Sequence, residues 1–388
     1  MHSSENTYAA LDAEICGDYA KAIEIYNQLI AEDMEDSLIE IEPELQQGLK
    51  DMWDDRSLAC LHELLDWDQL YEKTQLLADD NDGVLSCVHD SKQRGRLIPL
   101  YVECLINASS KESPVPLRDE IPNTLNVLLP SKDKNEELYH WTESRLTPDI
   151  AACYAVLGEW TKVRLYVDKS YDMFIQSWSA LHPCAVSARH RLLQGLQRVV
   201  EQEDAVNFHL ARRSGSHNNI AMMLSRWEKS MPSTTDTVPV WNNIVRGRQI
   251  ALLGQSSTQG YQHLAHFHAK IAKAAITQGV LHVVKNQLNE STRNLKLALG
   301  KKPGINIEEV EAVVMYNRNS ILREPLGSNN VEDKFVTTMN LLRSDKIQQA
   351  NDPINRLRLL LMTADWLSLW TSYCDLPKSR RMGEDTLS

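Results

Sequence analysis

The sequence predicts an all-α protein, an irregular solenoid of helical hairpins that resembles tetratricopeptide repeats. Three observations lead to this fold class. Apolar residues recur at steps of three and four over long segments, glycine or aspartate interrupts these segments, and no strict alternation runs long enough to form a sheet. One helical pair cannot bury both of its faces alone, so we expect successive pairs to stack on their neighbours.

The first hairpin is "EICGDYAKAIEIYNQLI", residues 14–30. Its apolar run stops at Gly17-Asp18 and resumes at once with Tyr19, after which the apolar side chains fall on one helical face. A helix that ends at glycine, followed directly by a second helix, indicates an antiparallel pair.

Three further segments repeat this pattern. In each, we expect glycine or aspartate to adopt the unusual dihedral angles of a tight helix end, and the next residue to pack into the gap between the helices. The breaks are unevenly spaced, which favours an irregular array over a regular one. The breaks and the residues that follow them are Asp66 and Trp67, Gly158-Glu159 and Trp160, and Gly279 and Val280.

The chain divides into three helical regions separated by breaks in the apolar pattern. Proline and polar residues mark the expected loops and the tail. We expect N-terminal acidic hairpins over 1–110, a proline-rich loop over 111–135, central hairpins over 136–227, a loop over 228–240, C-terminal hairpins over 241–376 and a polar tail over 377–388.

The charge of this 388-residue chain is concentrated at its N-terminal end. Residues 1–82 hold 22 acidic and 4 basic side chains, whereas the net charge of the whole chain is −12. An acidic end does not favour nucleic-acid phosphates, but it could face a basic partner surface. The alternative interpretation is a solvated helical face without a partner.

Cysteine content and hydropathy favour a soluble intracellular protein. The seven cysteines form no CxxC pair, and most lie inside apolar helical patterns, where cysteine behaves as a small hydrophobic residue. No stretch approaches the roughly 18 consecutive apolar residues of a membrane span, so we expect no membrane association.

Motifs for catalysis are absent from the sequence. It contains no GxxxxGK[ST], GxGxxG, HExxH or GxSxG pattern, and we expect no catalytic residue, cofactor site or metal site. The segment "HLAHFH" places His263 and His266 on one helical face and His268 elsewhere, so we interpret it as a polar turn. Nine tryptophans are interpreted as packing residues, with an exposed binding pocket as the alternative.

Three segments resemble the FAT region of phosphatidylinositol 3-kinase-related protein kinases. They are "SLACLHELLDWDQLYE", "AVLGEWTKVRLYVDKSYDMFIQSWSAL" and "VPVWNNIVRGRQIAL". The family's "W-S-S/A-L" step is matched within residues 176–181, around Trp178. Its "xxxWxxIxxxR" pattern is matched by Trp241, Ile244 and Arg248, with Arg246 as an alternative to Arg248. Asn242 departs from the family's frequent acidic residue at that position.

The resemblance implies a non-catalytic helical scaffold that supports a Ser/Thr kinase domain within a longer chain. It further implies the branch of the family that acts in the nucleus in double-strand-break repair by non-homologous end joining. In that branch, the Ku heterodimer and DNA ends would be partners of the full-length assembly only. The chain itself contains neither a DRHxxN catalytic loop nor a DFG motif, so no kinase activity is expected of it.

Two other classes remain open. A free-standing tetratricopeptide-like adaptor would bind protein partners in a concave groove. An enzyme acting alone has no supporting motif in the sequence.

Overall fold

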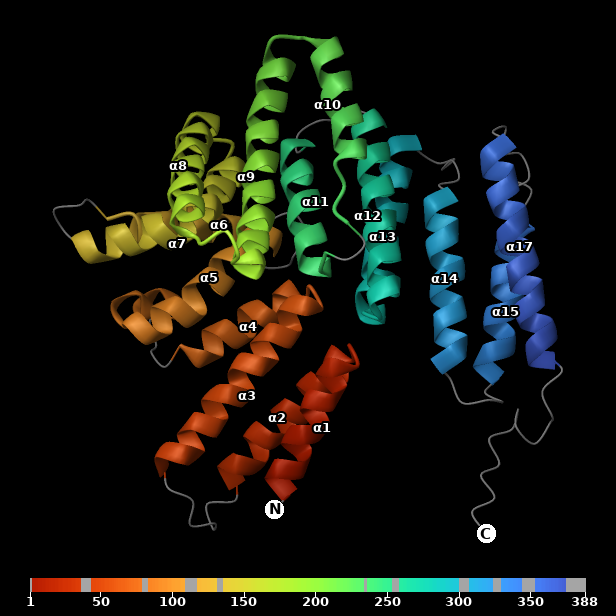
Figure 1. The fold of residues 1–388 in the computed structure, drawn as a ribbon, viewed down its shortest axis with the longest axis horizontal. Helices are drawn as coiled ribbons and strands as arrows, with labels where there is room; N and C mark the ends of the chain where they lie inside the picture. Colours follow the sequence, from red (N-terminus) through yellow and green to blue (C-terminus); the bar gives the residue numbers. More distant parts are fainter. Residues whose placement is uncertain are drawn as a thin grey trace. The chain divides into compact units, whose positions relative to one another are not determined.

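The described chain is a series of helices arranged in two compact units, Met1–Gly254 and Gln255–Ser388. The computed structural model describes residues 2–35, 43–78, 83–108, 117–130, 135–233, 236–252, 258–299, 307–323, 329–343 and 353–374. Over these ranges all regular structure is helical, which confirms the predicted fold class (Figure 1). The expected tail, 377–388, lies outside the described residues.

The first unit holds the helices that build the site. Most helices contact the one that follows them in the chain, but α11 also contacts α3, α7 and α9. The elements are α1 (His2–Ile15), α2 (Tyr19–Glu35), α3 (Pro43–Glu63), α4 (Trp67–Leu77), the 3₁₀ helix η1 (Val84–His89), α5 (Ser91–Ala108), α6 (Leu117–Leu128), α7 (Glu136–Leu157), α8 (Trp160–Ala180), α9 (Val186–Arg213), α10 (His217–Lys229) and α11 (Val238–Leu252).

The core of the second unit has two parts. A long hairpin of α12 (Thr258–Gln278) and α13 (Leu281–Leu299) buries Phe267, Val283 and Val284. Around the buried pair Phe335 and Trp366, a second cluster gathers α14 (Ile307–Arg323), α15 (Asn329–Leu342) and α17 (Pro353–Cys374).

The four predicted hairpin turns are present at the predicted places. In each turn a residue with positive φ sends its N–H to the carbonyl three residues back, and the next N–H reaches the carbonyl five residues back. At Gly158, for example, these bonds run to Ala155 (3.1 Å) and from Glu159 to Tyr154 (2.9 Å). The pair of bonds satisfies carbonyls that the helix end leaves open, as in a Schellman motif.

The second turn differs from the prediction in its left-handed residue. We expected Asp66 to take the unusual dihedral angles, but Leu65 does so, with φ of 54°. Asp66 instead caps α4, because its carboxylate accepts the N–H of Gln69 at 3.2 Å. Aspartate is a favourable N-cap residue, and Asp66 takes that role at the start of α4. The left-handed conformation therefore falls on the preceding residue, Leu65, where the other turns have glycine.

A fifth turn of the same kind joins α9 to α10 and was not predicted. Gly215 has φ of 69° and donates to Arg212, while Ser216 donates to Ala211. Serines on both sides of this glycine hide the apolar-stop-apolar pattern by which the other four turns are recognised.

The prediction of a continuous loop over 111–135 is wrong, since this segment contains α6. Pro122 lies inside that helix, yet Leu117, Ile121 and Leu125 form a buried face. Proline removes one helical hydrogen bond, and burial of the apolar face compensates for the loss. The compact units divide at Gly254, inside the predicted C-terminal region 241–376.

The four residues that we expected to pack between the helices of a hairpin are buried to different degrees. Trp67 and Val280 are buried, whereas Tyr19 and Trp160 are half-buried. The Trp160 ring stacks on His209 of α9 with 4.8 Å between ring centroids, so this turn also contacts the next hairpin.

Replacing Gly158 by alanine is expected to destabilise the first unit. No atom lies within 4 Å of the added Cβ, so the cost comes from the backbone φ of 82° and amounts to about 1–2 kcal/mol. Chemical unfolding followed by circular dichroism measures the change.

Gly195 gives the matched control. It lies inside α9 with the same open space around its Cβ, so Gly195→Ala is expected to stabilise the chain by about 0.5–1 kcal/mol. Equal effects of both substitutions would contradict the role assigned to the left-handed turn.

Candidate functional site

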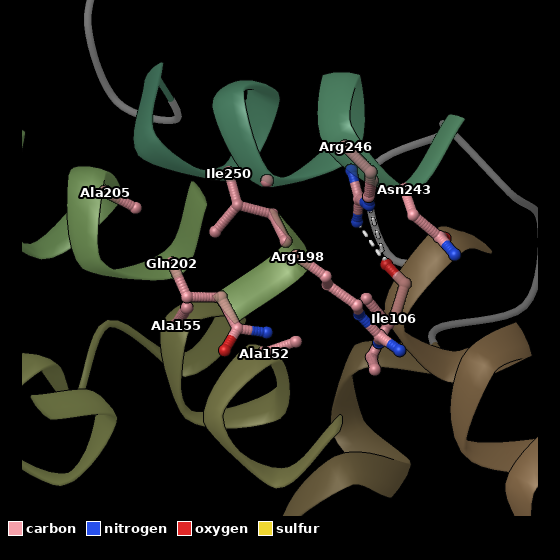
Figure 2. Close-up of a pocket in the computed structure, with 10 residues that line it drawn as sticks. Ile106, Ala152, Ala155, Arg198, Gln202, Ala205, Asn243, Arg246 and Ile250 are labelled. Atoms are coloured by element: carbon pink, nitrogen blue, oxygen red, sulfur yellow. Dashed lines mark hydrogen bonds between the residues drawn. The ribbon is translucent and has the colours of Figure 1, made fainter. Parts of the chain in front are cut away.

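A cluster of buried and half-buried polar side chains lies where α5, α7, α9 and α11 meet, and we call it the polar junction. Figure 2 shows Arg198 and Gln202 of α9 facing α7, and Arg246 of α11 directed at Ile106 of α5. These helices are far apart in sequence, so the junction holds together segments that no hairpin turn connects. Its charged members are Glu103, Asp149, Arg198, Glu201, Arg246 and Arg248.

Arg248 forms the most complete set of bonds in the junction. Its side chain is fully buried and pairs with Glu201 through two hydrogen bonds of 2.8 and 2.7 Å. It also donates to the carbonyls of Trp227 (2.7 Å) and Ser230 (2.9 Å). A bidentate pair with further backbone acceptors offsets the cost of removing two charges from water.

Gly247 lets α11 approach α9 beside this pair. A Cβ added to Gly247 would lie 3.3 Å from Cβ of Glu201, closer than such contacts normally are. Close helix packing therefore favours a glycine at this position, whereas its backbone conformation does not demand one.

Arg246 caps the end of α5. Its guanidinium donates to the Ile106 carbonyl from Nε at 3.0 Å and also from Nη2 (Figure 2). Next to it, Asn242 Nδ2 donates to Asn107 Oδ1 at 3.0 Å. The last carbonyls of a helix have no helical donor, so α11 supplies donors that α5 lacks. Burial lowers the pKa of Arg246, but the group stays protonated at neutral pH.

Arg198 connects α9 to the middle of α7. It pairs with Asp149 at 2.5 Å, and Gln202 Nε2 donates to the Pro148 carbonyl at 2.7 Å. Burial and the nearby Glu103 carboxylate raise the pKa of Asp149, although Arg198 opposes the shift.

His62 of α3 and Glu103 of α5 extend the junction toward the N-terminal helices. Their side chains lie 3.2 Å apart. Burial opposes charge on both groups, but their hydrogen bond and mutual attraction outweigh it. The pKa of His62 is therefore raised, and that of Glu103 is lowered to about 2 with help from Arg198 and Asn243.

A small cavity of about 20 Å³ lies inside the junction. It has room for one water molecule. Gln202 Oε1 is buried at its wall without a hydrogen-bond partner, so we expect a bound water to donate to it.

The predicted pattern residues fall at this junction. Trp241 and Ile244 are buried on α11, and Arg248 is the fully buried member of the pattern. Arg246, considered as an alternative to Arg248, is buried as well and makes different bonds. Trp178 is half-buried on α8, where it stacks on Phe174 and lies beneath Arg189.

The sequence missed the partners of these arginines. Glu103, Asp149, Arg198 and Glu201 were not singled out, because ion pairs between distant segments leave no local pattern. A signal was available for Glu103 and Asp149, whose neighbours three residues further on are the apolar Ile106 and Ala152. It was missing for Arg198 and Glu201, whose neighbours on the same helical face are mostly polar.

The three histidines of "HLAHFH" do not converge. His268 is buried and hydrogen-bonds Gln287 at 2.8 Å, whereas the rings of His263 and His266 lie beside Phe267. The prediction of a polar turn is wrong, because all three residues lie inside α12. Across the described ranges, no three His, Cys, Asp or Glu side chains gather in a way that could hold a metal ion.

Packing accounts for most of the tryptophans, as predicted. Trp141, Trp160, Trp178 and Trp370 are half-buried and contact neighbouring rings or cations. The buried ones are Trp53, Trp67, Trp227, Trp241 and Trp366.

Four of the cysteines are buried among apolar residues, which agrees with the interpretation of cysteine as a core residue. They are Cys60, Cys87, Cys104 and Cys153, and burial raises the pKa of three of them. Cys16 and Cys184 are exposed. None of the helices described here has the length and hydropathy needed to cross a membrane.

Comparison with known families gives one match, the FAT domain, over residues 121–318. The chain belongs to the FAT domain family. The matched range covers α7, α9 and α11, so most of the polar junction lies inside it. This agrees with the resemblance found in the sequence.

The chain is also similar to catalytic subunits of the DNA-dependent protein kinase. It is 23% identical to the Dictyostelium discoideum protein over 63% of this chain and 5% of that protein. It is 22% identical to the dog protein over 98% of this chain and 8% of that protein. The chain thus spans less than a tenth of the length of these relatives.

The FAT domain is a helical, non-catalytic region of kinases of this family, and no kinase domain is detected in this chain. The side chains of the polar junction agree with that class. Each of its arginines is bonded to a carboxylate or to the end of a helix. These bonds hold the helices in place and use the positive charges for packing inside the unit.

Replacing Arg248 by methionine is expected to destabilise the first unit by about 3–5 kcal/mol, because Glu201 then remains buried without its partner. In the double variant Arg248→Met/Glu201→Gln the loss should be smaller than the sum of the two single losses. Urea unfolding of all variants measures this coupling.

An exposed ion pair provides the control. Lys162 and Glu159 pair at 2.6 Å on the surface of the first unit, with about half of each side chain exposed. Lys162→Met should cost far less than Arg248→Met, because solvent screens an exposed pair. A loss as large as that of Arg248→Met would contradict the importance of burial.

The raised pKa of His62 predicts a pH dependence. A group whose pKa is raised on folding stabilises the fold below its unfolded pKa of about 6.5 and loses that contribution as pH rises through the folded value. We expect the melting temperature to fall as the pH rises above about 6.5, and to fall less in His62→Gln. Parallel curves for the two proteins would rule out this assignment.

Proposed function

We propose that the chain acts as the helical scaffold of a Ser/Thr protein kinase related to the DNA-dependent protein kinase. The scaffold would support a kinase domain lying in the same, longer polypeptide. The match to the FAT domain over residues 121–318 carries the proposal, and the similarity to the dog protein along nearly the whole chain supports it.

The proposed mechanism is mechanical. A stack of helices transmits a displacement when its parts are held as one body, and the polar junction holds α5, α7, α9 and α11 in that way. A shift of this stack would change access to the kinase site. Nothing in the mechanism requires the chain to bind nucleotide or metal.

The proposed cellular role is double-strand-break repair by non-homologous end joining in the nucleus. In this proposal the Ku heterodimer and DNA ends are partners of the full assembly and are not bound by this chain alone. The support is the name of the relatives, DNA-dependent protein kinase catalytic subunit.

Mass spectrometry of the endogenous protein tests the scaffold proposal. An antibody against residues 1–388 should capture a polypeptide much larger than 44.2 kDa whose peptides include a kinase domain. Cells that carry Arg248→Met in this gene should rejoin broken chromosomes more slowly, whereas Lys162→Met cells should behave as the parent.

The alternative function is a free-standing adaptor for protein partners. It would be favoured if the captured polypeptide had a mass of 44 kDa and carried no kinase peptides. That result would overturn the proposal of a kinase domain in the same chain.

A further inference from the structure

We propose that a groove between α3 and α5 binds an arginine side chain from a basic segment of a protein partner. The groove has a volume of about 580 Å³. It is lined by Leu58, Ala59 and Glu63 of α3 and by Gly95 and Leu100 of α5, and we call it the α3–α5 groove. Its volume is ample for one long side chain.

Three side-chain pairs join α3 to α5, and the groove lies between two of them. In each pair the two residues are 41 positions apart, so the helices run in the same direction in a fixed register. From Asp55 to His62, α3 advances about 10 Å without a further pair, and the α3–α5 groove opens there. The pairs are Asp51 with Lys92 (2.9 Å), Asp55 with Arg96, and His62 with Glu103 (3.2 Å).

Small residues keep the groove open, and leucines give it an apolar wall. Ala59 and Gly95 are exposed, and no atom lies within 4 Å of a Cβ added to Gly95. Leu58 is buried and Leu100 is half-buried. The methylene groups of a long side chain can therefore pack against this wall while its charged end stays polar.

Glu63 gives the groove a negative charge that no ion pair balances. Its side chain is half-buried, and across the described part of the chain no hydrogen bond or ion pair reaches its carboxylate. The other charges that line the groove are paired across the two helices. Burial raises the pKa of Glu63, although the neighbouring His62 opposes the shift. A cation bound beside this carboxylate would favour its charged form.

The wider surface has the same sign of charge. Residues 1–82, which include α3, hold 22 acidic and 4 basic side chains. Two of the four basic side chains, Arg56 and Lys73, are already paired with Glu14 and Asp54. The basic residues of α5 that face α3 are used in the pairs described above. A positively charged partner is therefore attracted to this end of the first unit.

An arginine side chain fits the apolar wall and the carboxylate together. Its methylene groups would lie along Leu58 and Leu100, and its planar guanidinium would donate to both oxygens of Glu63. The phosphates of a nucleic acid or of an anionic lipid would be repelled by the same surface. The occupant is therefore a basic segment of a protein.

Fluorescence anisotropy with the chain of 388 residues tests the proposal. The probe is a labelled synthetic peptide with arginine at every third position among alanines. We expect saturable binding to the chain that weakens with added salt. A matched peptide carries citrulline, which keeps the shape of arginine without its charge, and it should bind roughly tenfold more weakly or worse.

Two variants locate the site without removing a packing contact. Glu63→Gln keeps the shape of the side chain but removes its charge, and Gly95→Leu places a side chain in the groove where its Cβ meets no atom. Each should weaken binding roughly tenfold or more. The controls are Glu24→Gln, at an exposed acid of α2, and Gly195→Leu, at an exposed glycine of α9, which should bind as the parent does. Circular dichroism confirms that each variant keeps its helical content.

Three results would overturn the proposal. One is equal binding of the arginine and citrulline peptides, and another is an unchanged affinity in Glu63→Gln or in Gly95→Leu. The third is an equal loss of affinity in Glu24→Gln, because the peptide would then bind a diffuse acidic surface. Free arginine at the concentration of the peptide should leave the peptide bound, and displacement would indicate a site for a small molecule.

Discussion

Helix α11 and its two buried arginines determine how the first unit is assembled. Hairpin turns join helices that are neighbours in sequence, but they cannot fix α5 against α9. Arg246 binds the end of α5, and Arg248 binds Glu201 on α9, so a single helix connects both. Because an arginine buried without partners is costly, this pairing permits one arrangement of the helices and penalises the others.

The local turns supply the second level of order. Five turns use the same pair of backbone bonds, and in four of them the residue after the left-handed position also accepts the first bond of the next helix. One residue thus ends one helix and begins another. Such turns fix the angle within a pair, while the polar junction fixes the relation between pairs.

Sequence predicted the local level well and the tertiary level poorly. Gly17, Gly158 and Gly279 could be recognised because only glycine takes positive φ at little cost, whereas Leu65 takes it against its preference. Pro122 suggested a loop where tertiary burial maintains a helix. Arg198 and Asp149 are far apart in the chain, and no local pattern predicts such a pair.

The functional features divide in the same way, into those that local sequence predicts and those that require the structure. The pattern around Trp241 indicated the FAT family from sequence, and comparison with known proteins supports it. The polar junction required the structure, since it depends on which face of each helix is covered.

Hydrogen–deuterium exchange at the end of α5 tests the central claim most directly. If Arg246 holds this end, Arg246→Met should accelerate exchange over residues 103–108 and leave the α1–α2 hairpin unchanged. Unchanged exchange over residues 103–108, in a variant that keeps its helical content, would contradict the account.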